Sequence, residues 1–212
     1  MTASRQPRPF LSGVILAAGG SVRMGVPKQL LPLAGRPLLQ HALDAATAAG
    51  LDEIVLVLGH AADAVSAALT IPARPPTRAV VNSAWGEGQS TSLRAGLGAA
   101  DARAGAAAVL LGDQPGVTPL LIQRVAEAFF ASGRRAARPV WRARDRRIPG
   151  HPVVLARDAW PAMEALRGDE GARAVLAAHP DWLLEVEIAG EPPSDIDDAN
   201  DYLEALDTVG RA

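Results

Sequence analysis

A run of glycines and cations follows the first apolar stretch of the chain. Residues 16–28 read LAAGGSVRMGVPK, with Arg23 inside the turn and Lys28 at its far end. Glycines let backbone N–H groups approach a phosphate closely, because no Cβ stands in the way. An arginine fork and a lysine point charge together suit a polyphosphate whose charge grows in a transition state. The predicted nucleotide-binding residues of this cradle are Leu16, Ala17, Ala18, Gly19, Gly20, Arg23 and Lys28, and the last two are also predicted to be catalytic.

Two better-known phosphate-binding motifs do not match this loop. The adjacent Gly19 and Gly20 cannot supply the G-x-G-x-x-G pattern of a dinucleotide-binding loop. Gly25 is followed by Val26, where a Walker loop has Lys and then Ser or Thr. An ordinary strand-to-helix turn with solvated cations is the alternative interpretation. The order of residues over the whole segment favours the phosphate cradle.

A carboxylate stands at the exposed end of a second apolar strand. Leu110 and Leu111 lead into Asp113, and a carboxylate beside a buried strand is costly unless a cation or hydrogen bonds compensate it. Mg²⁺ takes oxygen ligands, commonly one or two carboxylates together with substrate phosphates. We therefore predict Asp113 to be catalytic, nucleotide-binding and a ligand of Mg²⁺. A turn-forming residue before Pro115 is the alternative.

The elements that must position these residues are short apolar runs alternating with alanine-rich stretches. The predicted strands are 13–17, 53–58, 78–81, 107–111, 153–156 and 183–188, and the predicted helices are 37–49, 61–69, 92–103, 119–131 and 199–206. Gly50 and Gly133 stand where helices usually end. This alternation predicts an α/β fold, a single-domain Rossmann-like, doubly wound and mostly parallel sheet. The carboxyl ends of such strands present the ligand crevice.

A basic stretch at residues 134–147 surrounds one further predicted strand. It carries seven arginines, Arg134, Arg135, Arg138, Arg142, Arg144, Arg146 and Arg147. A solvated face and a substrate-binding surface are both open interpretations of this stretch. His151, which follows it, is equally open to a functional or a structural role.

The composition excludes several classes of protein. The 212 residues carry 21 basic and 23 acidic side chains, a net charge of −2, which argues against a nucleic-acid partner. No cysteine is present, so thiol catalysis, disulfides and zinc ribbons are ruled out. No apolar run approaches the ~18 residues of a membrane-spanning helix, so no membrane association is expected. We expect a cytoplasmic protein with a flexible N-terminus over residues 1–10 and one domain over 11–212.

The chain resembles the MobA-like nucleotidyltransferases, and within them the molybdenum cofactor cytidylyltransferases. Their opening signature, L-A-A-G-x-S-x-R-M-G-x-x-K, is matched without a gap by residues 16–28. The resemblance continues through QLLPL at 29–33 and GRPLL at 35–39, and it spans nearly the whole chain. It implies the nucleotidyltransferase type of fold, with Mg²⁺ as cofactor and CTP as a substrate.

Later motifs extend the resemblance to further site residues. The segment 80–92 is similar to the family's N-x-x-W-x-x-G-x-x-x-S. This similarity implies nucleotide binding by Asn82, Gly88, Gln89 and Ser90. The alternative is that Ser90 or Ser92 only caps the N-terminus of a helix. The DID at 195–197 implies Asp197 as the second Mg²⁺ ligand, with Asp195 behind it. Asp201 also matches the family pattern, whereas residues 198–200 and Tyr202 depart from it. Helix N-capping by Asp197 or Asp198 predicts the same cluster of carboxylates. Two segments at 150–153 and 168–173 resemble those that flank the acceptor.

The activity implied by the resemblance is transfer of CMP from CTP to the terminal phosphate of molybdenum-molybdopterin, with release of pyrophosphate. Guanylyl transfer to the same cofactor and nucleotidyl transfer to a sugar or polyol phosphate are alternatives within enzymes. A nucleotide-binding protein without turnover that delivers cofactor is an alternative of another class. The implied partners are a molybdopterin-type cofactor and a molybdenum hydroxylase or its chaperone. Ala18, which gives the form L-A-A-G, implies CTP over GTP.

Overall fold

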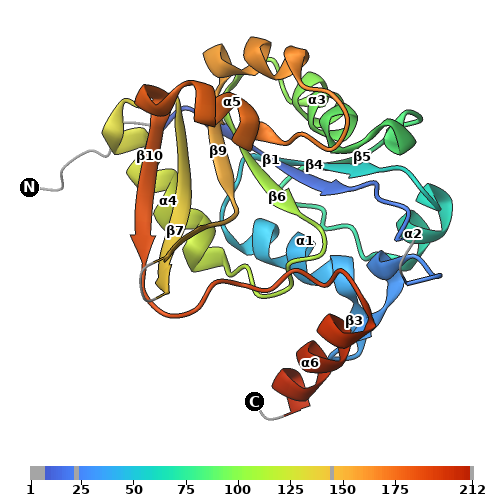
Figure 1. Cartoon of the computed structure of the whole chain (residues 1–212). Coiled ribbons are helices and arrows are strands. Elements are labelled where there is room, and N and C mark those ends of the chain that lie inside the picture. Colours follow the sequence, from blue (N-terminus) through green and yellow to red (C-terminus); the bar gives the residue numbers. More distant parts are fainter. Residues whose placement is uncertain (1–7, 22–23, 144–145, 211–212) are drawn as a thin grey trace, which may run out of the picture.

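The fold is a large mixed sheet with helices on both faces (Figure 1). The computed structural model describes residues 8–21, 24–143 and 146–210. Within them eight strands form this sheet, in the order β10-β7-β9-β6-β1-β4-β5 with β8 paired to β7. Only β8 and β9 run antiparallel to their neighbours. The predicted doubly wound, mostly parallel sheet is confirmed.

The strands of the large sheet lie close to their predicted positions, except the strand at residues 146–149, which was not predicted. They are β1 (Phe10–Ala17), β4 (Glu53–Leu58), β5 (Thr77–Val81), β6 (Ala104–Leu111), β7 (Ala136–Ala143), β8 (Arg146–Pro149), β9 (Val153–Ala156) and β10 (Leu183–Ile188). A separate hairpin consists of β2 (Pro32–Leu33) and β3 (Arg36–Pro37). The predicted last strand returns to the main sheet as β10, parallel to β7.

The helices lie between these strands along the chain, except the last helix, which follows the last strand. They are α1 (Leu38–Ala48), α2 (Ala62–Ala68), α3 (Gln89–Ala99), α4 (Pro119–Ser132), α5 (Ala172–Ala178) and α6 (Ala199–Gly210), with short 3-10 helices η1 (Lys28–Leu30), η2 (Trp85–Glu87), η3 (Arg157–Ala165) and η4 (Pro180–Trp182). No helix within the described ranges is long and apolar enough to span a membrane.

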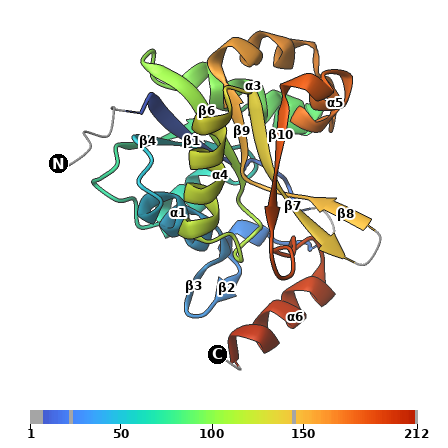
Figure 2. The same cartoon turned by 90° about the vertical axis from the view of Figure 1, so that its left-hand side faces the viewer.

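Alternate residues of the central strands face two separate cores. Ile15 of β1 packs with α1, α2 and α4 on one face, whereas Val14 packs with α3, η3 and α5 on the other. Successive side chains of a strand point to opposite faces, so a strand covered on both faces must be apolar throughout. Figure 2 shows α1 and α4 together on the first face, as their mutual contacts require. The continuous apolar runs of the sequence thus produce the two helical layers.

The last helix lies apart from the sheet and packs on the β2–β3 hairpin (Figures 1 and 2). Ile196, just before α6, is buried with Leu33 and Leu38 in a third, small core. The Tyr202 hydroxyl donates a hydrogen bond to the carbonyl of Pro32 at 2.6 Å. This docking carries the acidic segment before α6 back to the end of β6, where the amide of Ile196 donates to the carbonyl of Asp113 at 3.0 Å.

Two predicted boundaries need correction. The helix predicted at 92–103 is α3, which lies earlier in the chain. Gly88 is its N-cap, and the helix ends at Ala99. The next residues form a turn in which the carboxylate of Asp101 accepts hydrogen bonds from the backbone and the side chain of Arg103. The fold also starts before residue 11: Arg8 bonds Asp52 and the carbonyl of Gly50, both at 2.6 Å, and β1 begins at Phe10. Residues 1–7 of the predicted flexible N-terminus lie outside the described residues.

Candidate active site

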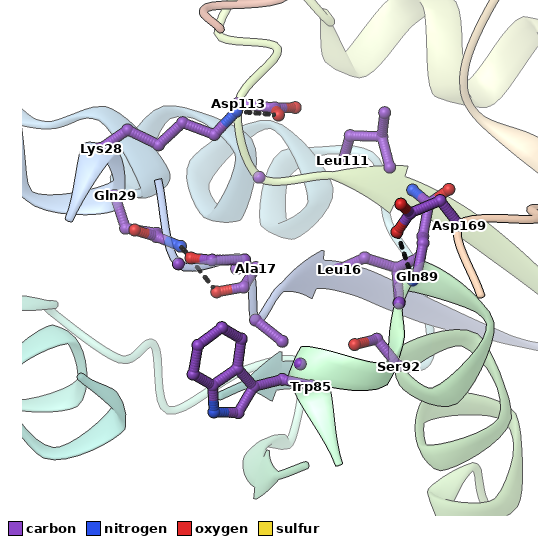
Figure 3. A pocket seen from close by; sticks show the side chains of 16 residues that line it. Leu16, Ala17, Lys28, Gln29, Trp85, Gln89, Ser92, Leu111, Asp113 and Asp169 are labelled. Carbon is purple, nitrogen blue, oxygen red and sulfur yellow. Dashed lines mark hydrogen bonds and ion pairs between the residues drawn. The ribbon is translucent and has the colours of Figure 1, made fainter. Parts of the chain in front are cut away.

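A cavity of about 310 Å³ opens at the carboxyl ends of β1 and β6, where the predicted crevice was expected (Figure 3). Nine of the predicted site residues line it: Leu16, Ala17, Ala18, Gly19, Gly20, Lys28, Gly88, Gln89 and Asp113. Residues that were not predicted as nucleotide-binding also line it, notably Gln29, Trp85, Ser92 and Asp169. Arg23, predicted to be catalytic and nucleotide-binding, lies outside the described residues.

Lys28 joins the two predicted metal ligands. Its Nζ donates to Asp113 Oδ2 at 2.7 Å and to Asp197 Oδ1 at 2.9 Å. Burial alone would lower the pKa of Lys28, but the charges and hydrogen bonds of Asp113 and Asp197 outweigh it, and the pKa is raised. The ammonium group is therefore charged throughout the physiological range. Three side chains predicted from distant motifs thus meet at one point.

The carboxylate of Asp113 has a second oxygen available to a cation. Its Oδ1 is buried and makes no hydrogen bond, and such an orphaned anionic atom is costly without a compensating charge. No group of three or more His, Asp or Glu side chains in the described ranges forms a metal site. Two carboxylates completed by substrate phosphates are what Mg²⁺ commonly uses. The residues present therefore fit a divalent cation that binds together with the nucleotide.

In the acidic segment before α6, the carboxylates that cap the helix belong to different residues from the carboxylate that contacts Lys28. Asp198 Oδ1 accepts from the amides of Asn200 and Asp201, and Asp201 Oδ2 accepts from those of Asp197 and Asp198. These two residues cap α6, while the carboxylate of Asp197 is directed at Lys28. The alternative that Asp197 is itself the helix cap is not what the structure shows.

Asp195, which the resemblance places behind Asp197, interacts electrostatically with Asp113 and Asp197. Its carboxylate accepts a hydrogen bond from the side-chain amide of Gln114. Burial raises the pKa of Asp195, and the negative charges of Asp113 and Asp197 raise it further. A cation bound at Asp113 and Asp197 would offset this mutual repulsion.

At Gly20 the glycine loop lies so close to Trp85 that a larger residue does not fit. A Cβ on Gly20 would lie 2.9 Å from the indole ring of Trp85. Trp85, from η2, also contacts the ring of His60 edge-on, with centroids 5.2 Å apart. The predicted segment 80–92 therefore reaches the loop through Trp85, which lies at the lower edge of the cavity in Figure 3.

The methyl group of Ala18 packs into the core at the edge of the cavity. It is only 4% exposed and belongs to the core under α3. A Cβ placed on Gly59 would meet the Ala18 methyl at 2.8 Å, so this methyl packs toward Gly59. Ala18 borders the cavity, yet its methyl is part of the core.

The segment 82–92 is held together by its own polar groups. Asn82 is buried, and its side-chain nitrogen donates to the hydroxyls of Thr91 and Ser92 at 2.8 and 3.0 Å. Its oxygen accepts from the amide of Ala84 at 3.0 Å. The Ser90 hydroxyl is buried without a partner, away from the cavity wall. Asn82 and Ser90 thus lie behind the wall, while Ser92, named in sequence only as a possible helix cap, lines the cavity.

The N-terminus of α3 is occupied by a distant loop. The amide of Gln89 donates to Asp169 Oδ1 at 3.3 Å and that of Ser90 to the carbonyl of Gly168 at 3.0 Å. Gly88 has φ 107°, and a Cβ on it would lie 2.1 Å from the Gly168 carbonyl carbon. Only glycine permits this approach. The two motifs predicted at 80–92 and 168–173 are therefore in direct contact.

A second cavity of about 760 Å³ adjoins the first and shares Leu16, Gln89 and Asp169 with it. His151 and Arg173, from the segments predicted to flank the acceptor, both line this second cavity. Burial lowers the pKa of His151 to about 4, against the charge of Asp113 that raises it. His151 is therefore neutral at physiological pH.

The basic stretch forms ion pairs across the edge of the sheet. Arg138 and Arg147 pair with Glu185 of β10 at 2.6 and 2.7 Å, and Arg142 pairs with Glu187. Arg138 also lines the second cavity. Substrate binding by Arg138 stays a prediction, and Arg144 lies outside the described residues.

Comparison with known proteins gives consistent results. The model of the MobA-like NTP transferase domain matches residues 13–182. A protein named nicotine blue oxidoreductase, from Paenarthrobacter nicotinovorans, is 36% identical over 182 residues, 84% of this chain and 86% of that protein. The crystal structure of Rv0371c from Mycobacterium tuberculosis H37Rv superposes with a TM-score of 0.82 at 33% identity, covering 94% of this chain and 98% of that one.

Two further structures bear on metal and fold. A complex of Rv0371c with manganese has a TM-score of 0.78 at 31% identity, covering 95% of this chain and all (100%) of that one. A 4-diphosphocytidyl-2C-methyl-D-erythritolsynthase from Anaerococcus prevotii DSM 20548 has a TM-score of 0.77 at 17% identity, covering 96% and 97% of the two chains. The second likeness concerns the fold alone, which is the mostly parallel α/β fold of nucleotidyltransferases.

Proposed function

Since the chain belongs to the MobA-like NTP transferase family, we propose that it transfers CMP from CTP to the terminal phosphate of molybdenum-molybdopterin and releases pyrophosphate. The observation that carries the nucleotidyl transfer is the meeting of Lys28, Asp113 and Asp197 beside the glycine loop. The choice of CTP and of the acceptor is supported by the L-A-A-G form of residues 16–19 and by the further motifs that resemble the cytidylyltransferases.

The reaction requires positioning and charge neutralisation more than proton transfer. An oxygen of the acceptor phosphate attacks the α-phosphorus of CTP, and the bond to the bridging oxygen of the β-phosphate breaks. A phosphate monoester has a second pKa near ~6 and is mostly deprotonated at neutral pH. A general base is therefore not needed, and His151, neutral and in the adjoining cavity, is assigned no proton transfer.

Lys28 and a divalent cation held by the two carboxylates would neutralise the charge of the phosphates in this proposal. Asp113 and Asp197 would hold Mg²⁺, which would supply positive charge to the phosphates of the nucleotide. Lys28, already charged in the site, adds a cation where negative charge accumulates on the leaving pyrophosphate. The second cavity, which shares three lining residues with the first, is the proposed site of the acceptor.

The product of this reaction would serve a molybdenum-containing hydroxylase, either directly or through its chaperone. The acceptor must reach the second cavity while the nucleotide occupies the first. Both cavities border Gln89 and Asp169, so these residues lie between the two proposed substrates.

Pyrophosphate release tests the proposal. Purified protein with Mg²⁺ is supplied with each of the four ribonucleoside triphosphates in turn, with molybdopterin or with a set of sugar and polyol phosphates as acceptor. We expect release with CTP and molybdopterin. Release with GTP alone would identify GTP as the substrate in place of CTP. Release only with a sugar or polyol phosphate would identify that compound as the acceptor in place of molybdopterin. Nucleotide binding without release of pyrophosphate would indicate a delivery protein.

A second candidate function comes from the name of one relative, an oxidoreductase that covers 84% of this chain. A redox activity would require an electron donor, such as a reduced nicotinamide or flavin, and an aromatic acceptor such as nicotine blue. The test measures the rate at which the donor is oxidised in the presence of that acceptor. A rate that is the same in the wild type and in Asp113→Asn would favour this candidate. Since Asp113 carries the nucleotidyl-transfer proposal, one variant separates the two functions.

A further inference from the structure

The side chain of Gln29 is built into the glycine loop from behind. It is 3% exposed, and its Nε2 donates to the carbonyl oxygens of Ala17 at 3.0 Å and of Gly19 at 2.9 Å. The preceding residue is attached to the same loop, because the amide of Lys28 donates to Ser21 Oγ at 2.9 Å. Figure 3 shows Gln29 beneath Lys28, at the same side of the cavity.

These two hydrogen bonds fix the direction of two peptide groups. In a trans peptide the C=O of one residue and the N–H of the next point in opposite directions. When the carbonyls of Ala17 and Gly19 point at Gln29, the N–H groups of Ala18 and Gly20 point away from it. Ala18, Gly20 and Gln29 all border the first cavity.

The chemistry of the contact requires an amide at this position. A primary amide nitrogen carries two hydrogens, one for each carbonyl, and a carboxylate carries none. The other atom of the group, Gln29 Oε1, is buried without a hydrogen-bond partner. An unsatisfied buried acceptor is unfavourable, so it is the two donated bonds that account for a glutamine here.

We propose that Gln29 is a positioning residue for the nucleotide phosphates. By holding the carbonyls of Ala17 and Gly19 away, it presents the amides of Ala18 and Gly20 to a triphosphate, and it prevents the carbonyl oxygens from facing the anion. Gln29 acts through the loop backbone and does not touch the reacting atoms. This inference rests on the proposed function, since it requires that the cavity binds a nucleoside triphosphate.

Two substitutions test the proposal through KM and pH. Gln29→Met removes both donors at similar length, and we expect the KM for CTP to rise about tenfold or more while kcat changes less, since two hydrogen bonds that order the loop are lost. In Gln29→Glu the carboxylate faces two carbonyls, and burial raises its pKa. Protonation restores one donor, so the KM of this variant should fall as the pH decreases from 8 to 6.

A second buried glutamine is the matched control. Gln40, 6% exposed in α1, bonds Asp44 and Thr70, outside the wall of the cavity. Gln40→Met should lower the thermal unfolding temperature as Gln29→Met does, without the rise in KM. Wild type and Gln29→Met should lack the pH dependence of KM that Gln29→Glu shows.

The outcomes separate this inference from the proposed function. The positioning role would be overturned by a KM of Gln29→Met within twofold of the wild-type value. It would also be overturned by a KM of Gln29→Glu that does not fall at lower pH. In both cases turnover by the wild type would still support the proposed function. If the wild type shows no turnover, the function fails. Calorimetric binding of CTP to wild type and Gln29→Glu across the same pH range then decides the role of Gln29, because binding requires no acceptor.

Discussion

Asp113 has one carboxylate oxygen bonded to Lys28 and one buried oxygen without a hydrogen bond. A metal ion bound to the second oxygen would compensate the cost of burying it. Asp113→Asn keeps the volume and removes the charge. We expect kcat to fall by about a hundredfold, on the order of 3 kcal/mol of transition-state stabilisation, with an unchanged fold by circular dichroism. A near-normal rate at saturating Mg²⁺ would remove Asp113 from the metal site.

Lys28 occupies the space between the two carboxylates and so competes with a divalent cation for them. In the nucleotide-free protein, Lys28→Met should increase the affinity for Mn²⁺ by about tenfold or more, because a positive charge near the cation is removed. Paramagnetic resonance of free Mn²⁺ measures this directly. Arg36→Met, which breaks the exposed pair with Asp44, is the control and should leave the affinity unchanged. Equal or weaker binding in Lys28→Met would contradict the competition.

His151 links stability to pH. Its pKa is lowered to about 4 by burial, below the ordinary value of about 6.5 of an unfolded chain. Between these values the unfolded state binds the additional proton, so stability falls as the pH decreases from about 6.5 toward 4, by up to about 3 kcal/mol. In His151→Gln this part of the pH dependence should disappear from urea unfolding curves. An identical pH dependence in both proteins would show that His151 is solvated.

At the scale of elements, the contact between Gly88 and Gly168 joins α3 to the loop before α5. Gly88→Ala would place a methyl group against the Gly168 backbone at a φ that alanine avoids, and we expect a rise in the KM for CTP together with reduced stability. Gly98→Ala, in the same helix with open space around it, should instead be stabilising by about 1 kcal/mol with unchanged kinetics. Similar kinetics in both variants would mean that the Gly88 contact does not shape the cavity.

The predicted bounds of three strands, β4, β9 and β10, agree with the structure at both ends. Turn residues mark two of these limits in the sequence, since Gly59 follows β4 and Pro152 precedes β9. The central strands β1 and β6 each begin three residues before their predicted start. The helix α3 was predicted three residues late, since its start depends on Gly88 meeting Gly168, a contact between segments 80 residues apart in sequence. The hairpin β2–β3 and strand β8 are short and have no periodicity to detect.

At the scale of the whole molecule, the sheet order brings three distant segments together. The loop after β1, the end of β6 and the segment before α6 meet because β1 and β6 are neighbours and because α6 docks on the β2–β3 hairpin. Lys28, Asp113 and Asp197, predicted from separate motifs, lie together at this edge of the sheet. Asn82 and Ser90 lie behind the cavity wall, and Arg23 is outside the described residues. Trp85 and Asp169 lie in segments that resemble the family's motifs, but neither was predicted as a site residue. Gln29 was not predicted either, because the role of a buried glutamine depends on partners that only the structure shows.

Transfer of a CMP group is the proposed activity of this assembly. The most direct measurement supplies CTP labelled at the α-phosphate, with Mg²⁺ and molybdopterin, and follows the label by chromatography. We expect the label to move to the acceptor in a one-to-one ratio with released pyrophosphate, GTP to be a poorer donor, and Asp113→Asn to transfer about a hundredfold more slowly. Label that remains in CTP or appears only as free CMP, with every acceptor tried, would contradict the assignment.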